Sequence, residues 1–151
     1  MDPGDLINLI DPKISDSMNE DLCRDFTPEE ISDALFQMRP LKAPGPDGFP
    51  ARFFQRHWEV VKDAVIAAVQ GFFRDGYLPP GVNDTAIVLI PKGDDPVELK
   101  DFRPISLCNV IYKVILKCLV NGLRPILDNI ISMEQSAFVP GRLITDNALI
   151  A

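Results

Sequence analysis

The first strong pattern of apolar and polar positions begins at residue 27. Thr27 is a good helix N-cap, Pro28 suits the first helical position, and Glu30 stands where a capping box requires an acid. Apolar residues then recur at helical spacing as far as Met38, and Pro40 interrupts the pattern. The sequence therefore predicts a helix from the capping box to about Met38.

A longer amphipathic pattern covers residues 50–74. Val61, Val65 and Phe72 recur on one helical face, and Gly76 stands where such a helix would end. We predict helix throughout this stretch, in one piece or in two.

His57 and Trp58 lie near the start of that stretch. No Cys or carboxylate stands at metal-ligand spacing from this single His, so we interpret it as structural. Trp58 is interpreted as a core anchor rather than a surface on which a base stacks.

Two short apolar runs flank a turn in the middle of the chain. Residues 85–90 are rich in β-branched side chains, residues 104–107 are extended, and the sequence GDDP at residues 93–96 breaks regular structure between them. An antiparallel hairpin would bring Lys92 and Arg103 together at its loop end. Two cations there are either a phosphate clamp or solvated side chains at a loop rim, and their spacing leaves both interpretations open.

The adjacent acids Asp94 and Asp95 lie in that turn. Carboxylate pairs that hold metal ions for phosphoryl transfer need rigid strands, whereas this pair lies in a loop before Pro96. We interpret the pair as a solvated turn and predict no metal site.

A third helical pattern follows Asn109, which is placed to cap a helix over residues 110–121. Gly122 and Pro125 are costly inside a helix, so we expect a bend and a second segment at residues 123–129.

The sequence KAPGPDG at residues 42–48 separates the first two helical patterns. Pro44 and Pro46 favour extended neighbours, and Gly45 and Gly48 permit unusual backbone angles. The loop is either a stiff element that approaches a partner closely or a rigid connector between two helices.

The net charge of -7 is unevenly distributed. Residues 1–33 carry ten acidic and two basic side chains, and residues 34–151 carry twelve and thirteen, so the balances are -8 and +1. Residues 1–26 are interpreted as a loosely ordered acidic leader with at most one weak helical turn. The nearly neutral remainder permits a local basic groove without predicting one.

The general composition is that of one soluble domain of 151 residues. No apolar run approaches the ~20 residues of a membrane span, and the N-terminus does not resemble a signal peptide, so we expect no membrane association. Three cysteines without a Cys-x-x-Cys pair favour a reducing compartment, and the protein is expected in the cytoplasm or nucleus. Cys108 and Cys118 are predicted to be buried thiols.

Three sequence blocks occur in a fixed order. They are residues 42–48 (KAPGPDG), residues 89–92 (LIPK) with 101–109 (DFRPISLCN) and 112–113 (YK), and residues 135–142 (QSAFVPGR) continued by 144–147 (ITDN). In this order and spacing the chain resembles the reverse transcriptases of non-long-terminal-repeat (LINE-type) retrotransposons, in the form abundant in plants. The resemblance covers about residue 27 to the end and, more weakly, the acidic leader.

The resemblance implies an α+β fold: the mostly helical fingers subdomain of a right-hand polymerase, with one β-hairpin and a truncated palm. Residues 27–151 would be a partial reverse transcriptase domain. On the family pattern, Lys92 and Arg103 match residues that bind the triphosphate of the incoming nucleotide. Four further positions match blocks that line the template side: Lys42, Gln135, Gly141 and Arg142.

The family's catalytic aspartates belong to palm motifs that follow the third block, and this sequence ends before them. The resemblance therefore implies no catalytic residue and no cofactor bound by this fragment, although the complete enzyme uses Mg²⁺ with an RNA template, a DNA primer and a deoxynucleoside triphosphate. We expect the 151-residue polypeptide by itself to be inactive. Gly122 and Pro125 depart from the family pattern and indicate sequence decay or a tolerated bend.

Three hypotheses remain open at this stage. The chain is a fragment of a reverse transcriptase, a retained nucleic-acid-binding module, or a structural domain with no nucleic-acid role. Its oligomeric state is not indicated by the sequence.

Overall fold

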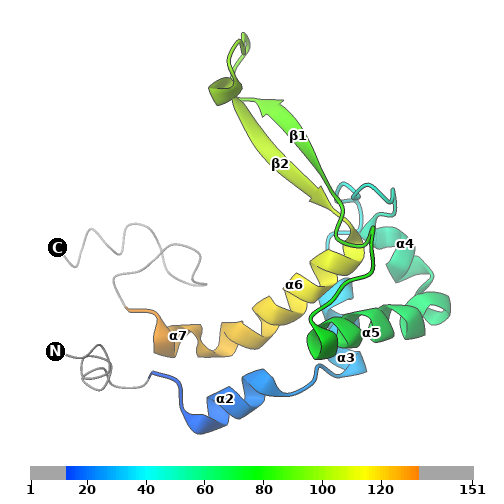
Figure 1. Ribbon diagram of the computed structural model, residues 1–151, viewed down its shortest axis with the longest axis vertical. Coiled ribbons are helices and arrows are strands. Elements are labelled where there is room, and N and C mark those ends of the chain that lie inside the picture. The colour runs from blue at the N-terminus through cyan, green and yellow to red at the C-terminus, as the bar shows by residue number, and fades with distance from the viewer. Residues whose placement is uncertain (1–12, 133–151) are drawn as a thin grey trace. The chain divides into compact units, whose positions relative to one another are not determined.

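The computed structural model describes residues 13–132, which form helices and one β-hairpin (Figure 1). These residues divide into two compact units. One unit is Asp25–Val120, and the other combines residues 13–24 with residues 121–132. The mixture of helices with one antiparallel sheet is the α+β class that was predicted.

Helix α3 (Pro28–Phe36) begins with the predicted capping box. The Glu30 N–H donates to Thr27 Oγ1 at 3.2 Å, and the Thr27 N–H donates to Glu30 Oε2 at 2.9 Å. The helix ends at Phe36 with Gln37 as its C-cap, slightly before the predicted end at Met38.

The second helical pattern forms two helices, α4 (Ala51–Arg56) and α5 (Trp58–Asp75). His57 separates them, and the centroid of its ring lies 5.1 Å from the centroid of the Phe53 ring. Gly76 ends α5 with a φ of 66°, the left-handed conformation that glycine adopts without strain.

The core of the Asp25–Val120 unit lies among α3, α4, α5 and α6 (Val110–Leu123). Helical periodicity places apolar side chains of each helix on the face that meets the others. Trp58 packs against this core, as predicted. The buried residues are Ile31, Ala34, Leu35, Ala51, Val65, Val69, Val110, Val114, Ile115 and Cys118.

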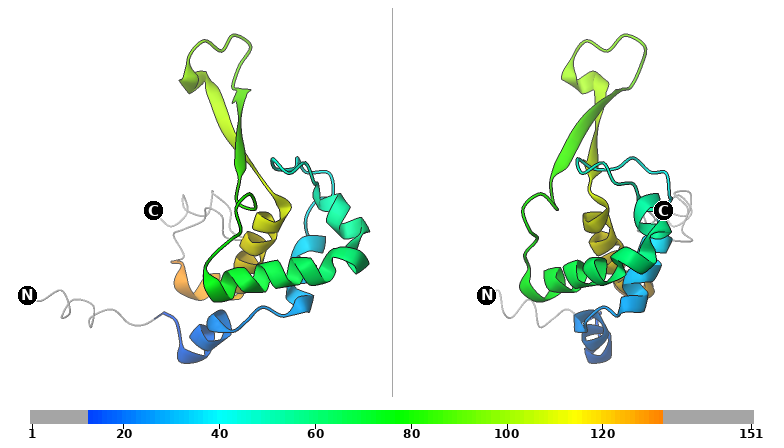
Figure 2. Two further views of the ribbon diagram at one scale, coloured as in Figure 1. Left: turned by 45° about the vertical axis from the view of Figure 1, so that its right-hand side comes forward. Right: turned by 90° about the vertical axis from the view of Figure 1, so that its right-hand side faces the viewer.

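Strands β1 (Thr85–Pro91) and β2 (Phe102–Cys108) form the predicted antiparallel hairpin. All residues of β1 are exposed, because the hairpin extends away from the helices of its unit (Figure 2). The 3-10 helix η1 (Leu99–Asp101) lies in the connecting loop.

The bend predicted after α6 is also present. A short 3-10 helix η2 (Arg124–Ile126) contains Pro125, and helix α7 (Leu127–Ile130) follows. Gly122 lies inside α6, so the helix continues slightly further than predicted.

Part of the acidic leader is more regular than its composition suggested. Residues Asp16–Cys23 form helix α2, where we had predicted no more than one weak turn. Ser15 explains the difference, because its Oγ accepts a hydrogen bond from the Met18 N–H at 3.3 Å and caps the helix. Residues 1–12 lie outside the described residues.

The three cysteines differ in burial. Cys118 is buried as predicted, and burial raises the pKa of its thiol to about 11. Cys108 is only half-buried, because it lies at the base of the exposed hairpin, where Thr85 Oγ1 donates to its sulfur at 3.5 Å. Cys23 is exposed. Within residues 13–132, no helix has the length and apolarity to cross a bilayer.

Candidate functional site

Lys92 and Arg103 lie at the loop end of the hairpin. Arg103 pairs directly with Ile90 in the register of the hairpin, and Lys92 directly follows Pro91, the last residue of β1. The two cations therefore both lie where the strands meet the connecting loop. The hairpin and this juxtaposition were both predicted from the sequence.

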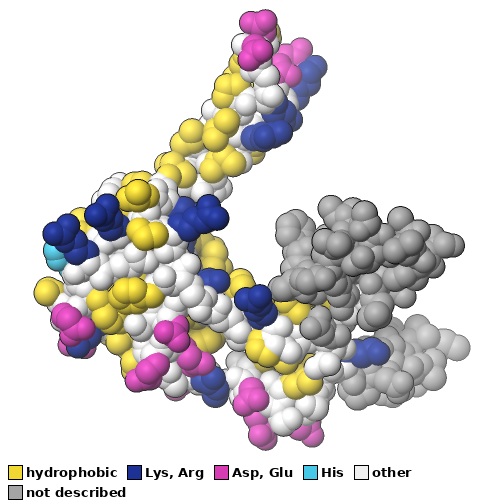
Figure 3. All heavy atoms as spheres, turned by 180° about the vertical axis from the view of Figure 1, so that it is seen from behind, with side chains coloured by type: hydrophobic (Ala, Val, Ile, Leu, Met, Phe, Trp, Pro, Cys, Tyr) yellow, Lys and Arg dark blue, Asp and Glu magenta, His cyan; other side chains and the backbone are white. Residues whose placement is uncertain are grey.

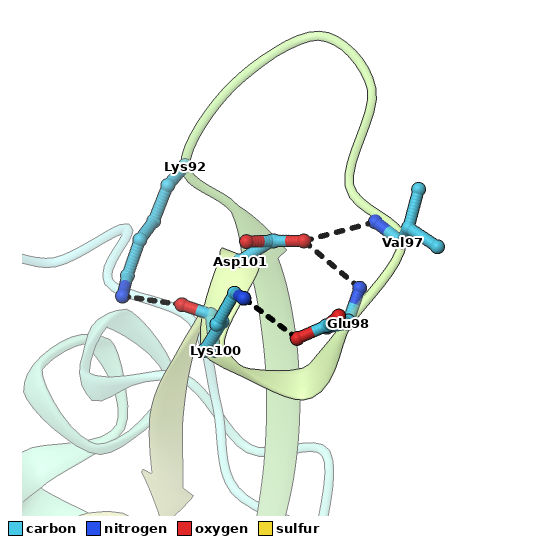
Figure 4. Close-up of polar contacts among 5 residues, drawn as sticks. All are labelled: Lys92, Val97, Glu98, Lys100 and Asp101. Atoms are coloured by element: carbon cyan, nitrogen blue, oxygen red, sulfur yellow. Dashed lines mark hydrogen bonds and ion pairs between the residues drawn. The ribbon is translucent and has the colours of Figure 1, made fainter.

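The Lys92 ammonium group already has a partner within the chain. Its Nζ donates to the Lys100 carbonyl at 2.6 Å (Figure 4). Its backbone N–H donates to the Asp101 carbonyl at 2.8 Å. An ammonium group carries three protons, so two remain for another ligand. The Lys92 side chain is therefore held in place, and two of its N–H protons can still bind a ligand.

Asp101 organises the loop between the strands. Its Oδ2 accepts the Val97 N–H at 3.1 Å and the Glu98 N–H at 2.8 Å (Figure 4). These two bonds lower the pKa of the Asp101 carboxyl, because they stabilise its ionised form. Glu98 also pairs with Lys100 at 2.7 Å. The loop end of the hairpin is thus a structured turn.

Asp94 and Asp95 are exposed in the same loop. Among residues 13–132, no three or more His, Cys, Asp or Glu side chains lie together as metal ligands would. The donor set therefore does not fit a two-metal centre, which needs clustered carboxylates.

Two adjoining grooves on the helical part are lined by cations. The first, of about 610 Å³, has an apolar floor that includes Val110 and Leu116, and the second is about 970 Å³. Arg39 and Lys42 line both. Among residues 13–132, the residues that line the two grooves include six basic ones and no acidic one: Arg39, Lys42, Arg52, Arg56, Lys113 and Lys117.

These cations have no carboxylate partner among the described residues, where the ion pairs join other side chains. Figure 3 shows Lys and Arg side chains near the base of the hairpin with no Asp or Glu among them. Unneutralised cations lining one concave surface attract anions, and more strongly when the walls have a low dielectric constant. The grooves thus form a basic surface on a chain whose net charge is -7.

The loop at residues 42–48 is attached to the start of α6. An ideal Cβ on Gly45 would lie 2.2 Å from Asn109 Oδ1 and 2.4 Å from the Asn109 backbone nitrogen. Asn109 Oδ1 accepts the Asp47 N–H at 3.2 Å, and Lys113 Nζ donates to the Ala43 carbonyl at 3.0 Å. The loop does make a close backbone approach, and the partner is the chain's own α6.

The predicted site residues do not all come together. Lys42 lines the grooves, whereas Lys92 and Arg103 lie at the loop end of the hairpin. Arg103 stands six positions before Asn109, which lies at the hairpin base, and six steps of extended strand correspond to roughly 20 Å. Gln135, Gly141 and Arg142 lie outside the described residues.

Sequence reasoning missed five of the six groove cations. A usable signal was present, because Arg52 and Arg56, and likewise Lys113 and Lys117, are four residues apart on helices and share a face. The sequence does not show that the two pairs face the same grooves, because this depends on how α4 and α6 pack.

Asn109 was predicted to cap α6, and this was wrong for its side chain. All its side-chain hydrogen bonds go to distant loops: one from the Asp47 N–H, and two that its Nδ2 donates to the carbonyls of Gly81 (2.8 Å) and Val82 (3.3 Å). The residue is only 3% exposed, so these partners replace water completely.

Comparison with known proteins adds an independent observation. No family model matches the chain. It is 34% identical over 139 residues to the Transposon TX1 uncharacterized 149 kDa protein of Xenopus laevis. It is 25% identical over 125 residues to the Retrovirus-related Pol polyprotein from type-1 retrotransposable element R1 of Bradysia coprophila.

The chain is homologous to proteins of non-long-terminal-repeat retrotransposons. These alignments cover 92% and 81% of the chain but only 11% and 12% of the two relatives. The chain is thus related to a Pol polyprotein and to a second transposon protein, and it spans about a tenth of the length of each. The plant-like form of the family stays a prediction.

Proposed function

We propose that this region is part of the fingers of a retrotransposon reverse transcriptase, and that its basic grooves contact the nucleic-acid backbone. The observation that carries the proposal is the set of six cations without carboxylate partners that lines the grooves. Phosphate contacts position nucleic acid without reading its sequence, and Lys and Arg supply most of them. Homology to a Pol polyprotein makes nucleic acid the ligand that best fits this surface.

The hairpin cations carry the second part of the proposal. Lys92 and Arg103 bind the triphosphate of the incoming nucleotide, with Arg103 as a planar fork and Lys92 as a point charge. Their position together at the loop end of the hairpin supports this role. Gln135, Gly141 and Arg142 contribute to the template side.

No polymerisation step is assigned to this chain. The complete family enzyme binds Mg²⁺ through palm aspartates, none of which matches a residue here, and the described carboxylates do not cluster. We therefore expect no primer extension by the 151-residue polypeptide alone, measured with a primed RNA template and Mg²⁺. Primer extension by the pure polypeptide would contradict the fingers assignment.

The groove proposal is tested by the salt dependence of binding to an RNA–DNA duplex. Replacing Arg52 and Arg56 together by Gln removes two groove cations, so the slope of log affinity against log salt should become shallower by about 1 to 2. The matched control replaces Lys62 and Arg74, which pair with Glu59 and Asp75 away from the grooves, and should leave the slope nearly unchanged.

Two results would count against the groove as the contact. Either wild-type binding is insensitive to salt, or the two double variants weaken binding equally. Equal weakening would mean that only net charge matters.

The hairpin proposal needs a separate measurement. A deoxynucleoside triphosphate is titrated into the chain, and amide chemical shifts along β1 and β2 are followed by nuclear magnetic resonance. Shifts should concentrate around Lys92 and Arg103 and vanish with Arg103→Gln. Shifts that concentrate on the grooves instead would remove the triphosphate role from the hairpin.

A further inference from the structure

The base of the hairpin is joined to the 42–48 loop by one buried amide. Strand β2 ends at Cys108, directly before Asn109, and β1 begins three residues after Val82. The Asn109 side chain therefore lies where both strands meet the helices, and its bonds reach both neighbouring loops.

The Asn109 amide uses its oxygen and both of its N–H protons in these contacts. Its Oδ1 accepts the Asp47 N–H, and its Nδ2 has two protons, with carbonyl partners on Gly81 and Val82. Gly45 packs against the Asn109 backbone so closely that no Cβ fits between them. The same 42–48 loop carries Lys42, which lines both grooves.

We propose that Asn109 is a positioning residue that sets the hairpin and the 42–48 loop relative to each other. Its amide oxygen holds the loop that carries Lys42, and its amide nitrogen holds the turn that leads into β1. The hairpin itself has few other means of orientation, because β1 is exposed along its whole length.

A consequence follows for the proposed function, on which this part of the inference rests. If one nucleic-acid ligand contacts the grooves and the hairpin together, Asn109 determines whether both reach it. The residue contributes no charge of its own. Its substitution should therefore weaken binding without changing the number of cations.

Two substitutions at Asn109 separate the two halves of its role. Asn109→Asp keeps an oxygen acceptor for the Asp47 N–H but loses both donors, so only the 79–84 turn is released. Asn109→Ala removes the acceptor and the donors and releases both loops. The matched control is Asn83→Asp, the same chemical change on an exposed side chain in that turn.

Hydrogen exchange reports the two loops separately. The Asp47 N–H reports the 42–48 loop, and the N–H groups of Val82 and Asp84, which donate to Pro79 and Gly81, report the turn. Asn109→Asp should speed exchange at Val82 and Asp84 while Asp47 stays protected. Asn109→Ala should speed exchange at all three amides, and the control should match wild type.

A distance measurement reports the hairpin itself. Spin labels are placed at the exposed positions Val97 and Val60 by Val97→Cys and Val60→Cys, with Cys23 and Cys108 replaced by Ser and the buried Cys118 retained. The distance distribution should be narrow in the parent protein and broader in both Asn109 variants. The label positions touch neither the grooves nor Asn109.

Each outcome bears on the proposal. The pattern above supports it, and unchanged protection and distances in folded Asn109 variants overturn it. Uniformly faster exchange throughout residues 25–120, or loss of the cooperative fold in both variants, also overturns it, because Asn109 would then be a general stability determinant. If only Asn109→Ala fails to fold, Asn109→Asp decides.

Duplex binding distinguishes this inference from the proposed function. If wild type binds an RNA–DNA duplex, both Asn109 variants should bind about 5-fold or more weakly, which corresponds to ~1 kcal/mol. If folded Asn109 variants with displaced hairpins bind the duplex as tightly as wild type, the position of the hairpin does not affect duplex binding. If wild type binds no duplex, the proposed function fails, and exchange and distances still decide the positioning role.

Discussion

The tight contact between Gly45 and the start of α6 leads to the sharpest stability prediction. A Cβ added at Gly45 would lie 2.2 Å from Asn109 Oδ1, 2.4 Å from the Asn109 nitrogen and 2.5 Å from the Cys108 carbonyl carbon. Two of these three atoms are backbone at a helix start, so they cannot move aside as a flexible side chain would. Gly45→Ala must therefore displace the 42–48 loop.

The cost can be assembled from its parts. Forced overpacking costs about 1–3 kcal/mol, and losing the bond between the Asp47 N–H and Asn109 adds about 1 kcal/mol. The lower entropy of the unfolded alanine chain offsets about 0.4–1 kcal/mol. We expect Gly45→Ala to lower the free energy of unfolding by roughly 1–3.5 kcal/mol. For a unit of about 100 residues, the melting temperature would fall by roughly 4 °C or more.

Gly71→Ala is the matched control, because it makes the same chemical change in the same unit. A Cβ there would meet only Arg74 Nη2, at 3.9 Å, an ordinary contact. Gly71 lies inside α5, where alanine is favoured over glycine by about 1 kcal/mol, so this variant should be stabilised. Urea and thermal unfolding followed by circular dichroism would measure both. Finding Gly45→Ala as stable as Gly71→Ala would refute the reasoning.

Three further predictions concern other parts of the chain. Gln55 Nε2 donates to the carbonyls of Leu35 and Met38, both at 3.0 Å. Gln55→Met should therefore lower the free energy of unfolding, measured by urea titration, by about 1–3 kcal/mol. The control Gln37→Met, at an exposed position, should have little effect in the same titration. Bonds from the N–H groups of Glu98 and Val97 lower the pKa of the Asp101 carboxyl, so the stability that Asp101 gives the loop is present above the ordinary carboxyl pKa of about 3.9 and is lost as pH falls through the lower folded pKa. The amide chemical shifts of Val97 and Glu98 should therefore titrate with a midpoint below about 3.9. A midpoint at or above that pH would disprove the two bonds. Burial raises the pKa of Cys118 to about 11, so mass spectrometry after alkylation should find Cys23 modified in the folded protein and Cys118 only after unfolding; equal rates would contradict the burial of Cys118.

The local structure could largely be predicted from the sequence. Thr27, Glu30 and Gly76 act through backbone groups within a few residues, so their effects on helix ends follow from nearby sequence alone. The hairpin likewise follows from two apolar runs around a turn, and its pairing places Lys92 and Arg103 at the same loop end. The sequence by itself thus determined most elements and the juxtaposition of the hairpin cations.

The groove system and the role of Asn109 were decided by tertiary structure. The bond from the Asp47 N–H to Asn109 joins residues 62 apart in sequence, and the bond from Lys113 to the Ala43 carbonyl joins residues 70 apart. Local rules predict that the Asn109 side chain caps α6. In the folded protein this side chain is instead buried beside two distant loops, and its amide forms three hydrogen bonds with them. No spacing rule reports such a competition, because it depends on which loops the packing of α4 and α6 brings to one place.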